Sequence, residues 1–502
     1  MMPNLNPQSR NQPEDTDARL GRNDSEFRID LDRIRFSRYF SRLSAVTQVI
    51  PQAGSGTVVH NRLTHSLKVT AVARAIAIDL IHGPEASTIA ELGGCDPVVV
   101  QAAAAAHDLG HPPFGHLGEQ VLDRMARERL GLPDGFEGNA QTFRILTTLD
   151  TCDAAERGLN LTAAVRAAVL KYPWARDEWL GVFPPADQLP RGVGMDRSDG
   201  AQKFSAYSVN AAEMREVKSA YPEIALHQQT IECSVMDVAD DIAYSVHDLD
   251  DFYRAGVLQH TIVSAELNGW LTNRLALSKL PRETLVKQLR APGYSLELAW
   301  RHVQAKDSWI ADAEAFAESV LRVQVDLVDG LLAVPYDGGL AAERAVAAFT
   351  RHWIDRLKSS ISVDSRPHVR SGHVRLAKDT WHDVVVLKFV HSRFVLDRPD
   401  LAIYQRGQAR VIETLVEGFH AWLNDPDDAF RAPRRLTDSV ESSTQAYLES
   451  PGRDVGPAEL ERLGRARAII DYVASFTDAQ ATSAAALISG TSDSLWEDGR
   501  SL

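Results

Sequence analysis

The sequence predicts an all-α protein, and three observations point to this fold class. Long stretches such as 64–81 repeat apolar residues at the three- and four-residue spacing of a helix with one buried face. The alanine-rich stretch VVVQAAAAAHDLG (98–110) is typical of a buried helix that ends at a glycine. The alternation of apolar and polar residues that marks strands occurs in few places.

The same periodicity predicts helices along most of the remaining chain. They are expected at 159–170, 208–220, 229–255, 311–333, 341–360, 379–396, 399–424 and 457–476. Two polar stretches, 184–200 and 424–457, are interpreted as a long loop and as a loose connection to a C-terminal helical piece. Residues 1–26 are expected to form a disordered N-terminal tail, and residues 491–502 a C-terminal tail.

Composition limits the classes of protein to which the chain can belong. Its 502 residues suit one large domain or two to three ordinary ones. A net charge of −14 argues against a protein that mainly coats nucleic acid, so a polyanionic ligand would need a local group of Lys and Arg or a metal ion. Three distant cysteines exclude a disulfide scaffold. Since no apolar run has membrane length and the start lacks a signal segment, we expect a soluble cytoplasmic protein.

Residues 107–119, HDLGHPPFGHLGE, concentrate three histidines and two acids, which packing alone does not require. Imidazole and carboxylate groups are common ligands of divalent metal ions. His107 and Asp108 diverge by about 100° on a helix, yet both can reach one ion near the helix end. His65 lies on the apolar stripe of its helix, where histidine is more often a core residue, but the nearby Arg62 suits an anionic substrate.

A second acidic stretch, VMDVADDIAYSVHDLDD (235–251), mixes six carboxylates with apolar residues. Asp240, Tyr244 and Asp248 follow one another at four-residue steps and share one helix face. The stretch is too apolar for a solvated face. We therefore expect at least one carboxylate to point inward and to need a partner such as a metal ion.

Together these motifs resemble those of the HD-domain metal-dependent phosphohydrolases, and among them the deoxynucleoside triphosphate triphosphohydrolases related to bacterial dGTPase. The resemblance implies an all-helical HD core, expected at 27–265, and a helical C-terminal region at 266–490 that completes the fold and the contacts of a homo-oligomer. The motifs that carry it are RLTHSLKV (62–69), HDLGHPPFGHLGE (107–119), GFEGNAQTFRIL (135–146), LKYPWA (170–175), VMDVADDIAYSVHDLDD (235–251) and RPDLAIYQRGQARVI (398–412).

The resemblance assigns roles by position. It implies a divalent metal ion, magnesium, manganese or another transition metal, with the ligands His65, His107, Asp108 and Asp240. Asp240 is preferred to Asp241 because the family's ligand lies four residues before a nucleotide-contacting tyrosine, here Tyr244. His116 matches the catalytic histidine and Glu119 its carboxylate partner, and His111 is a further catalytic candidate. The positions that match nucleotide contacts are Gln48, Arg62, Lys171, Tyr172, Lys203, Tyr244 and Asp248.

Simpler interpretations of several residues stay open. His111 can cap the turn before the Pro-Pro pair, and His116 can be a turn histidine bonded to backbone. Glu137, with Asn139, can cap the helix that follows, and Lys171-Tyr172 can be the cationic end of a helix. The basic run SRPHVRSGHVRLAK (365–378) is a solvated loop, or it meets a phosphate of the substrate, an allosteric nucleotide or single-stranded DNA.

The implied activity is hydrolysis of dNTPs, with dGTP favoured or all accepted, at the α-phosphorus to give a deoxynucleoside and tripolyphosphate. One alternative is an HD phosphohydrolase for nucleoside monophosphates, cyclic nucleotides or alarmones, and another is a non-catalytic nucleotide-sensing or DNA-binding assembly protein.

Three segments depart from the family pattern and bear on base preference. RLSAVTQV (42–49) lacks a lysine, DYVASFTDAQA (471–481) lacks a methionine, and KFSAY (203–207) lacks a glycine.

Overall fold

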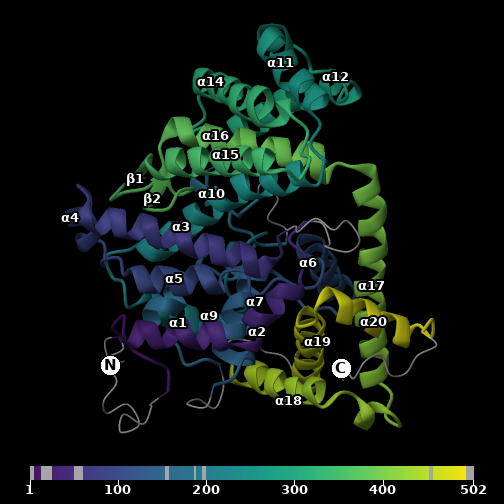
Figure 1. The fold of residues 1–502 in the computed structure, drawn as a ribbon. Coiled ribbons are helices and arrows are strands. Elements are labelled where there is room, and N and C mark those ends of the chain that lie inside the picture. The colour runs from purple at the N-terminus through teal and green to yellow at the C-terminus, as the bar shows by residue number, and fades with distance from the viewer. Residues whose placement is uncertain are drawn as a thin grey trace. The chain divides into compact units, whose positions relative to one another are not determined.

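The structure is a computed structural model that describes residues 5–12, 25–49, 60–152, 158–185, 188–194, 199–450 and 456–492. Within this part of the chain nearly every regular element is a helix, and one two-stranded hairpin is the exception (Figure 1). The predicted all-α fold is confirmed. The two expected tails fall mostly outside the described residues. Residues 5–12 are described, and there Arg10 bonds the buried Asp30 at 2.6 Å.

The chain folds into two compact units. Unit 1 takes its described residues from Met1–Pro51, Asn61–Met236 and Tyr404–Leu502, and unit 2 from Gln52–His60 and Asp237–Ile403. Two long helices, α10 (Ile231–Arg254) and α17 (Pro399–Leu423), contribute residues to both units. The compact unit that holds the N-terminal helices thus also holds the described residues from Tyr404 onward. The boundary that we expect at 265/266 stays a prediction.

Unit 1 is built around the alanine-rich helix α5 (Pro97–Ala106). Seven of its ten residues are buried, and five of them are alanines. Small side chains let neighbouring helices approach closely, and α5 packs against α1, α3 and α8. The other elements of unit 1 are α1 (Glu26–Phe36), α2 (Arg38–Arg42), η2 (Leu43–Ala45), α3 (Arg62–His82), α4 (Ala86–Glu91), α6 (Gly115–Arg124), η3 (Met125–Arg129), α7 (Gly138–Arg144), η4 (Ile145–Leu149), α8 (Ala163–Ala168), η5 (Arg176–Trp179), η7 (Ser208–Asn210), α9 (Ala211–Lys218), η11 (Ala429–Arg431), α18 (Arg434–Glu449), α19 (Pro457–Ala474) and α20 (Asp478–Ile488).

Helix α3 shows why its sequence folds as expected. Asn61 caps it by accepting a hydrogen bond from the backbone of Thr64, whose side chain accepts one from the Asn61 backbone in return. The predicted apolar stripe is buried, and His65 lies on it with 3% of its surface exposed. The helix therefore carries one histidine into the interior of unit 1.

Unit 2 contains the middle of the chain and the hairpin. Strands β1 (Ile361–Val363) and β2 (Val374–Leu376) pair antiparallel, so most of the basic run 365–378 forms the connection between them. There Arg370 pairs with Asp307 at 2.7 Å. The other elements are α11 (His260–Leu277), α12 (Arg282–Lys287), α13 (Tyr294–Lys306), α14 (Ala313–Val323), η8 (Gln324–Gly330), η9 (Leu331–Ala333), α15 (Leu340–Lys358), α16 (Lys378–His391) and η10 (Ser392–Leu396).

The interpretation of 424–457 as a loose connection is wrong for its central part, which forms α18. This helix is mostly polar, but it buries Leu436, Ser443 and Tyr447 on one face, and it lies side by side with α19 (Figure 1). Too few apolar residues mark that face for the periodicity to stand out in the sequence. Packing against α19 stabilises the helix instead.

The close approach of α18 and α19 depends on Gly464. A Cβ at this position would lie 2.6 Å from the Cα of Thr444 and 2.7 Å from its backbone nitrogen. We predict that Gly464→Ala forces the helices apart and lowers the free energy of unfolding by about 1–3 kcal/mol, the usual range for overpacking. The measurement is the denaturant midpoint. Gly407→Ala is the matched control, because Gly407 is likewise inside a helix, α17, and a Cβ there meets no atom within 4 Å. Equal midpoints for the two variants would contradict the prediction.

Candidate active site

Three of the predicted metal ligands gather inside unit 1. His65 comes from α3, while His107 and Asp108 directly follow the last residue of α5. The imidazole rings of His65 and His107 are 5.6 Å apart. His107 Nε2 lies 3.5 Å from Asp108 Oδ1. The structure thus brings two segments separated by some forty residues to one buried spot.

The donor set fits a divalent metal ion. His107 Nδ1 bonds the carbonyl oxygen of Ala104 at 2.7 Å, which fixes the ring and assigns the lone pair to Nε2, as in many metal-binding histidines. Two ligand atoms at ~2.1 Å from one ion lie roughly 3–3.5 Å apart. The 3.5 Å between His107 Nε2 and Asp108 Oδ1 matches this separation.

Asp108 is held as a charged carboxylate. Its Oδ2 accepts a hydrogen bond from Arg62 Nη1 at 3.0 Å, and its Oδ1 lies 3.0 Å from His111 Nδ1. Burial alone would raise the pKa of Asp108, but His107, Arg62 and His111 together hold that pKa well below its usual value. Burial and the Arg62 charge lower the pKa of His111 to about 4. His111 is therefore neutral near pH 7, and its Nδ1 lies beside the Asp108 carboxylate without a well-aligned hydrogen bond.

Asp240 lies on α10, one turn beyond Met236, the last residue of that helix in unit 1. Its role as a fourth ligand stays a prediction. Within the same stretch, Asp241 pairs with Lys388 of α16 at 2.7 Å. Asp241 therefore already has a cationic partner inside unit 2.

His116 and Glu119 form a hydrogen-bonded pair in the first turns of α6. His116 Nδ1 lies 3.1 Å from Glu119 Oε2, and the His116 ring is 5.1 Å from that of His111. The two members differ in burial, since the His116 side chain is 63% exposed and that of Glu119 only 8%. A buried acid thus orients an accessible imidazole, which is the arrangement expected of an oriented acid-base histidine.

Glu119 is further fixed by a network that the sequence did not reveal. Its Oε1 accepts hydrogen bonds from Lys203 Nζ at 2.7 Å and from the Gly138 backbone at 3.1 Å. Lys203 also lies 3.0 Å from Glu137. Burial would raise the pKa of Glu119, but Lys203 and His116 outweigh it and hold that pKa well below the usual range. Burial raises the pKa of Glu137 despite Lys203.

The interpretation of Glu137 as a helix cap is supported by geometry. Its carboxylate accepts hydrogen bonds from the backbone of Asn139 at 2.5 Å and of Ala140 at 3.2 Å, at the start of α7. The same carboxylate pairs with Lys203. Glu137 is therefore both the N-cap of α7 and part of the charge network around Glu119.

A tight turn before α6 presents His116. Phe114 adopts a left-handed backbone conformation with φ of 65°, and Gly115 follows with φ of 59°. A Cβ on Gly115 would lie 2.7 Å from Arg62 Nη2. At the other end of the motif, a Cβ on Gly110 would lie 2.0 Å from the carbonyl oxygen of Gly138. These close approaches explain why the motif needs glycine at both positions.

The predicted nucleotide contacts of unit 1 lie in different surroundings. Arg62 is 1% exposed, and its Nε and Nη2 meet no hydrogen-bond acceptor among the described residues. Gln48 Oε1 is buried and likewise meets no donor in that part of the chain. Tyr172 packs against Trp174 with ring centroids 5.9 Å apart. Lys171, just before it, bonds Gln229 through its carbonyl oxygen at 3.1 Å.

In unit 2, α16 contacts the α10 face that carries Tyr244 and Asp248. The His391 ring lies 5.0 Å from the Tyr244 ring and stacks on Phe252 at 5.2 Å. His391 Nδ1 lies 3.7 Å from Asp248 Oδ2. Lys388 lies 5.8 Å from the centre of the Tyr244 ring. No sequence motif marks these two α16 residues, because they sit in an ordinary apolar helix pattern.

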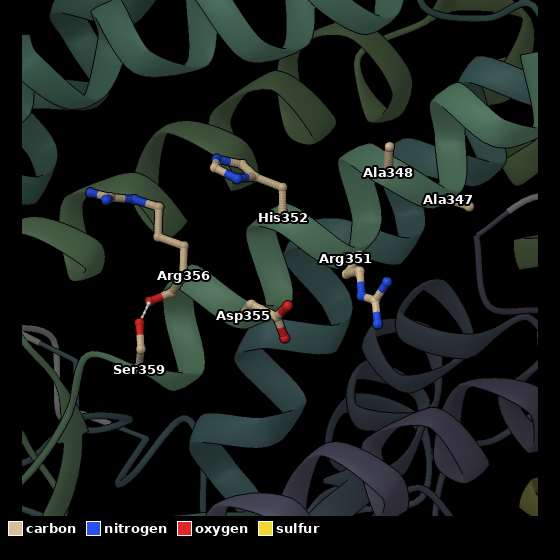
Figure 2. Close-up of a pocket in the computed structure, with 7 residues that line it drawn as sticks. All are labelled: Ala347, Ala348, Arg351, His352, Asp355, Arg356 and Ser359. Carbon is tan, nitrogen blue, oxygen red and sulfur yellow. Dashed lines mark hydrogen bonds between the residues drawn. The ribbon is translucent and has the colours of Figure 1, made fainter.

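A surface hollow of about 760 Å³ lies on α15 of unit 2, and none of the predicted site residues lines it (Figure 2). Its lining comes from that one helix, so groups from separate elements do not converge there. Two of its charged side chains are committed elsewhere, Arg356 to the buried Asp383 at 2.9 Å and His352 to Asp326 at 3.4 Å. The hollow has none of the features of a catalytic pocket. Its lining residues are Ala347, Ala348, Arg351, His352, Asp355, Arg356 and Ser359.

Two parts of the chain match known families. Residues 62–149 match the HD domain, and residues 374–486 match the phosphohydrolase-associated domain. The first match contains His65, His107, Asp108, His116 and Glu119. HD domains are metal-dependent hydrolases, so the matched family agrees with the donor set described above.

Similar proteins come from several bacteria. A deoxyguanosinetriphosphate triphosphohydrolase-like protein of Streptomyces coelicolor is 32% identical over 94% of this chain and 94% of its own length. One of Bifidobacterium longum is 31% identical over 90% of this chain and 80% of its own. A protein of Mesorhizobium japonicum, called deoxyguanosinetriphosphate triphosphohydrolase-like protein 2, is 40% identical over 46% of this chain and 47% of its own. Among the described residues, the helices are too short or too polar to cross a membrane.

The network around Glu119 gives a pH-dependent prediction. Lys203→Met leaves Glu119 and Glu137 buried without their shared cation, which should cost about 1–3 kcal/mol of stability near neutral pH. Without Lys203, burial raises both carboxyl pKa values above the unfolded value of about 4.3. The folded variant then binds more protons than the unfolded chain, so its deficit should shrink as the pH falls from 8 toward 5.

The check is the denaturant midpoint of the wild type and of Lys203→Met at several pH values. Lys287→Met is the matched control, because Lys287 is exposed on α12 and makes no ion pair with the described residues. A deficit that stays constant or grows toward pH 5 would show that Lys203 does not compensate these carboxylates.

Proposed function

Because the chain belongs to the family of deoxyguanosinetriphosphate triphosphohydrolase-like proteins, we propose that it is a metal-dependent hydrolase of deoxynucleoside triphosphates. It cleaves dGTP, or dNTPs more broadly, at the α-phosphorus and releases a deoxynucleoside and tripolyphosphate. One observation carries the proposal: in unit 1, a buried His-His-Asp donor set lies in the same motif region as an oriented His116–Glu119 pair.

We assign a divalent ion, magnesium, manganese or another transition metal, to His65, His107, Asp108 and Asp240. When bound, such an ion supplies positive charge that stabilises the charge developing on a phosphoryl group. The chain's own contribution is to hold the ligands. Arg62 holds Asp108 in place and keeps its carboxylate ionised, and the Ala104 carbonyl fixes the His107 ring. Metal affinity therefore depends on residues that do not touch the ion.

His116 is the proposed proton-transfer group. Its Nδ1 faces Glu119, so Nε2 is the nitrogen directed to the substrate. The ionised Glu119 keeps the ring in one orientation and stabilises the imidazolium that forms when His116 takes up a proton. His111 Nδ1 lies 3.0 Å from Asp108 Oδ1, and because this histidine is neutral near pH 7 it supports the arrangement without acting as an acid.

The proposed substrate contacts divide into two groups. Gln48, Arg62, Lys171, Tyr172 and Lys203 belong to unit 1, and Tyr244 and Asp248 to unit 2. Arg62 supports a phosphate contact because its buried guanidinium keeps two donors without acceptors in the described part of the chain. The proposal also includes a homo-oligomer, and an allosteric nucleotide or single-stranded DNA as a ligand of the basic run 365–378.

The test of the proposed function is a direct assay. Purified protein with manganese or magnesium is incubated with each dNTP, and tripolyphosphate and deoxynucleoside are both quantified. Release of the two in equal amounts supports the proposal. Release of orthophosphate or pyrophosphate, or activity confined to monophosphates, cyclic nucleotides or alarmones, would assign the chain to another class of HD phosphohydrolase. Nucleotide binding without turnover would favour a sensor.

The metal assignment gives the first prediction about activity. Asp108→Ala should lower the bound metal to a small fraction of the wild-type content and abolish turnover, because it removes one ligand and leaves Arg62 buried without its counterion. Metal content measured by elemental analysis is the readout. Asp438→Asn, which removes an exposed carboxylate of α18, is the control and should change neither quantity. Full metal occupancy in Asp108→Ala would exclude this ligand.

The His116–Glu119 pair gives the second. His116→Ala should lower the single-turnover rate by roughly 10²–10⁴-fold, the range for loss of a general acid-base, with metal content nearly unchanged. Glu119→Ala should lower the single-turnover rate by a smaller factor, because Glu119 orients the imidazole and transfers no proton. An empty metal site in His116→Ala would make this histidine a ligand. An unchanged rate would mean that His116 is only a turn histidine bonded to backbone.

A further inference from the structure

One carboxylate of the C-terminal region bonds two segments that lie far from it in the sequence. Asp478 is the first residue of α20. Its Oδ1 accepts a hydrogen bond from the backbone N–H of Phe114 at 2.8 Å. Its Oδ2 accepts one from the backbone N–H of Thr47 at 3.0 Å and another from the Thr47 hydroxyl. Both oxygens are thus used, on two different chain segments.

The first segment presents the proposed acid-base histidine. Phe114 is the N-cap of α6, its backbone is left-handed, and its own side chain makes no capping hydrogen bond. A non-glycine residue seldom holds this conformation unless its surroundings fix it. His116 follows two residues later. The hydrogen bond from Phe114 to Asp478 therefore holds the turn that sets the orientation of His116.

The second segment presents the proposed base contact. Thr47 directly precedes Gln48 and pairs with Asn61 in an antiparallel bridge. The carbonyl oxygen of Val46 accepts a hydrogen bond from the Arg62 backbone at 3.3 Å. The carbonyl oxygen of Thr47 comes within 3.3 Å of the position of a Cβ on Gly115. The segment thus touches both the start of α3 and the turn before α6.

We propose that Asp478 is a positioning residue of the active site: its two carboxylate oxygens fix the Thr47–Gln48 segment and the Phe114–His116 turn relative to each other. The inference rests on the proposed function for the roles of Gln48 and His116. Among the described residues, the Asp478 carboxylate bonds the backbone amides of Phe114 and Thr47 and the Thr47 hydroxyl. It acts through these groups and not through the side chains of Gln48 or His116.

Asp478 is itself held in place from two sides. Thr477 and Gln480 form a capping box that fixes the first turn of α20. Arg42 donates to the carbonyl oxygens of Phe476 at 2.7 Å, Leu109 at 3.1 Å and His111 at 2.5 Å. Arg42 thereby ties the residues just before α20 to the motif that contains the metal ligands. The carboxylate is therefore presented by a rigid support, as a positioning group must be.

The test compares two substitutions with one control. Asp478→Asn keeps the size but offers an acceptor to only one of the two segments, and Asp478→Glu keeps the charge but shifts the carboxylate by one methylene. In both, kcat should fall by about 10–100-fold, since a misplacement near 1 Å can cost ~10²-fold. KM should rise several-fold, because Gln48 is released as well. Metal content should stay at the wild-type level. Asp438→Asn should leave all three unchanged.

Hydrogen exchange gives a readout that does not depend on activity. Amides of residues 109–121 and 43–49 should exchange faster in both Asp478 variants than in the wild type, whereas those of 97–106 should not. Unchanged exchange in the first two segments would overturn the inference whatever the rates. Faster exchange in a protein whose wild type cleaves no dNTP would uphold the positioning role and reject the proposed function. If the loss of rate equals the loss of folded protein, Asp478 only stabilises the fold and does not position the site.

Discussion

The unit 1 site depends on the buried ion pair between Arg62 and Asp108. An ionised carboxylate with 4% of its surface exposed persists only with compensating charge and hydrogen bonds, and Arg62 supplies both. The pair also fixes geometry, because Arg62 starts α3 and Asp108 follows α5. By holding the start of α3 beside the end of α5, this ion pair also sets the directions of His65 and His107. Removing either partner would leave a buried charge and would loosen both helix ends at once.

The glycines around the motif follow from the same constraint. Arg62 lies so close to the turn before α6 that Gly115 has no room for a side chain. The residue before it, Phe114, has a left-handed backbone, a conformation that costs energy in a non-glycine residue unless its surroundings hold it. The support comes from a carboxylate more than 360 positions away. A short motif can therefore hold its conformation only with help from the C-terminal residues of the same unit.

Sequence reasoning worked where chemistry and spacing are local. The apolar stripe of α3 predicts that His65 is buried, as it is, and Glu119, which the resemblance pairs with His116, lies 3.1 Å from it. Contacts between distant segments leave no comparable signal. Asp478 lies in a segment that the resemblance includes, but nothing in that segment indicates its contacts, and His391 sits in an ordinary apolar helix pattern. The helix α18 was missed because its buried face is narrow and its stability comes from α19. The composition of unit 1, with described residues from the N-terminal and C-terminal parts of the sequence, does not follow from local patterns.

Lys203 shows how an expected contact and an observed one can both hold. The resemblance implies that it touches the nucleotide, whereas the structure pairs it with Glu119 and Glu137. An ammonium group has three N–H donors, and the two carboxylates take two of them. The third remains for a phosphate oxygen, and the Lys203 side chain is 38% exposed. A phosphate bound there would share with Glu119 the ammonium group that now contacts this carboxylate, and Glu119 in turn contacts His116. The proposed substrate and the proposed acid-base pair would thus share one ammonium group.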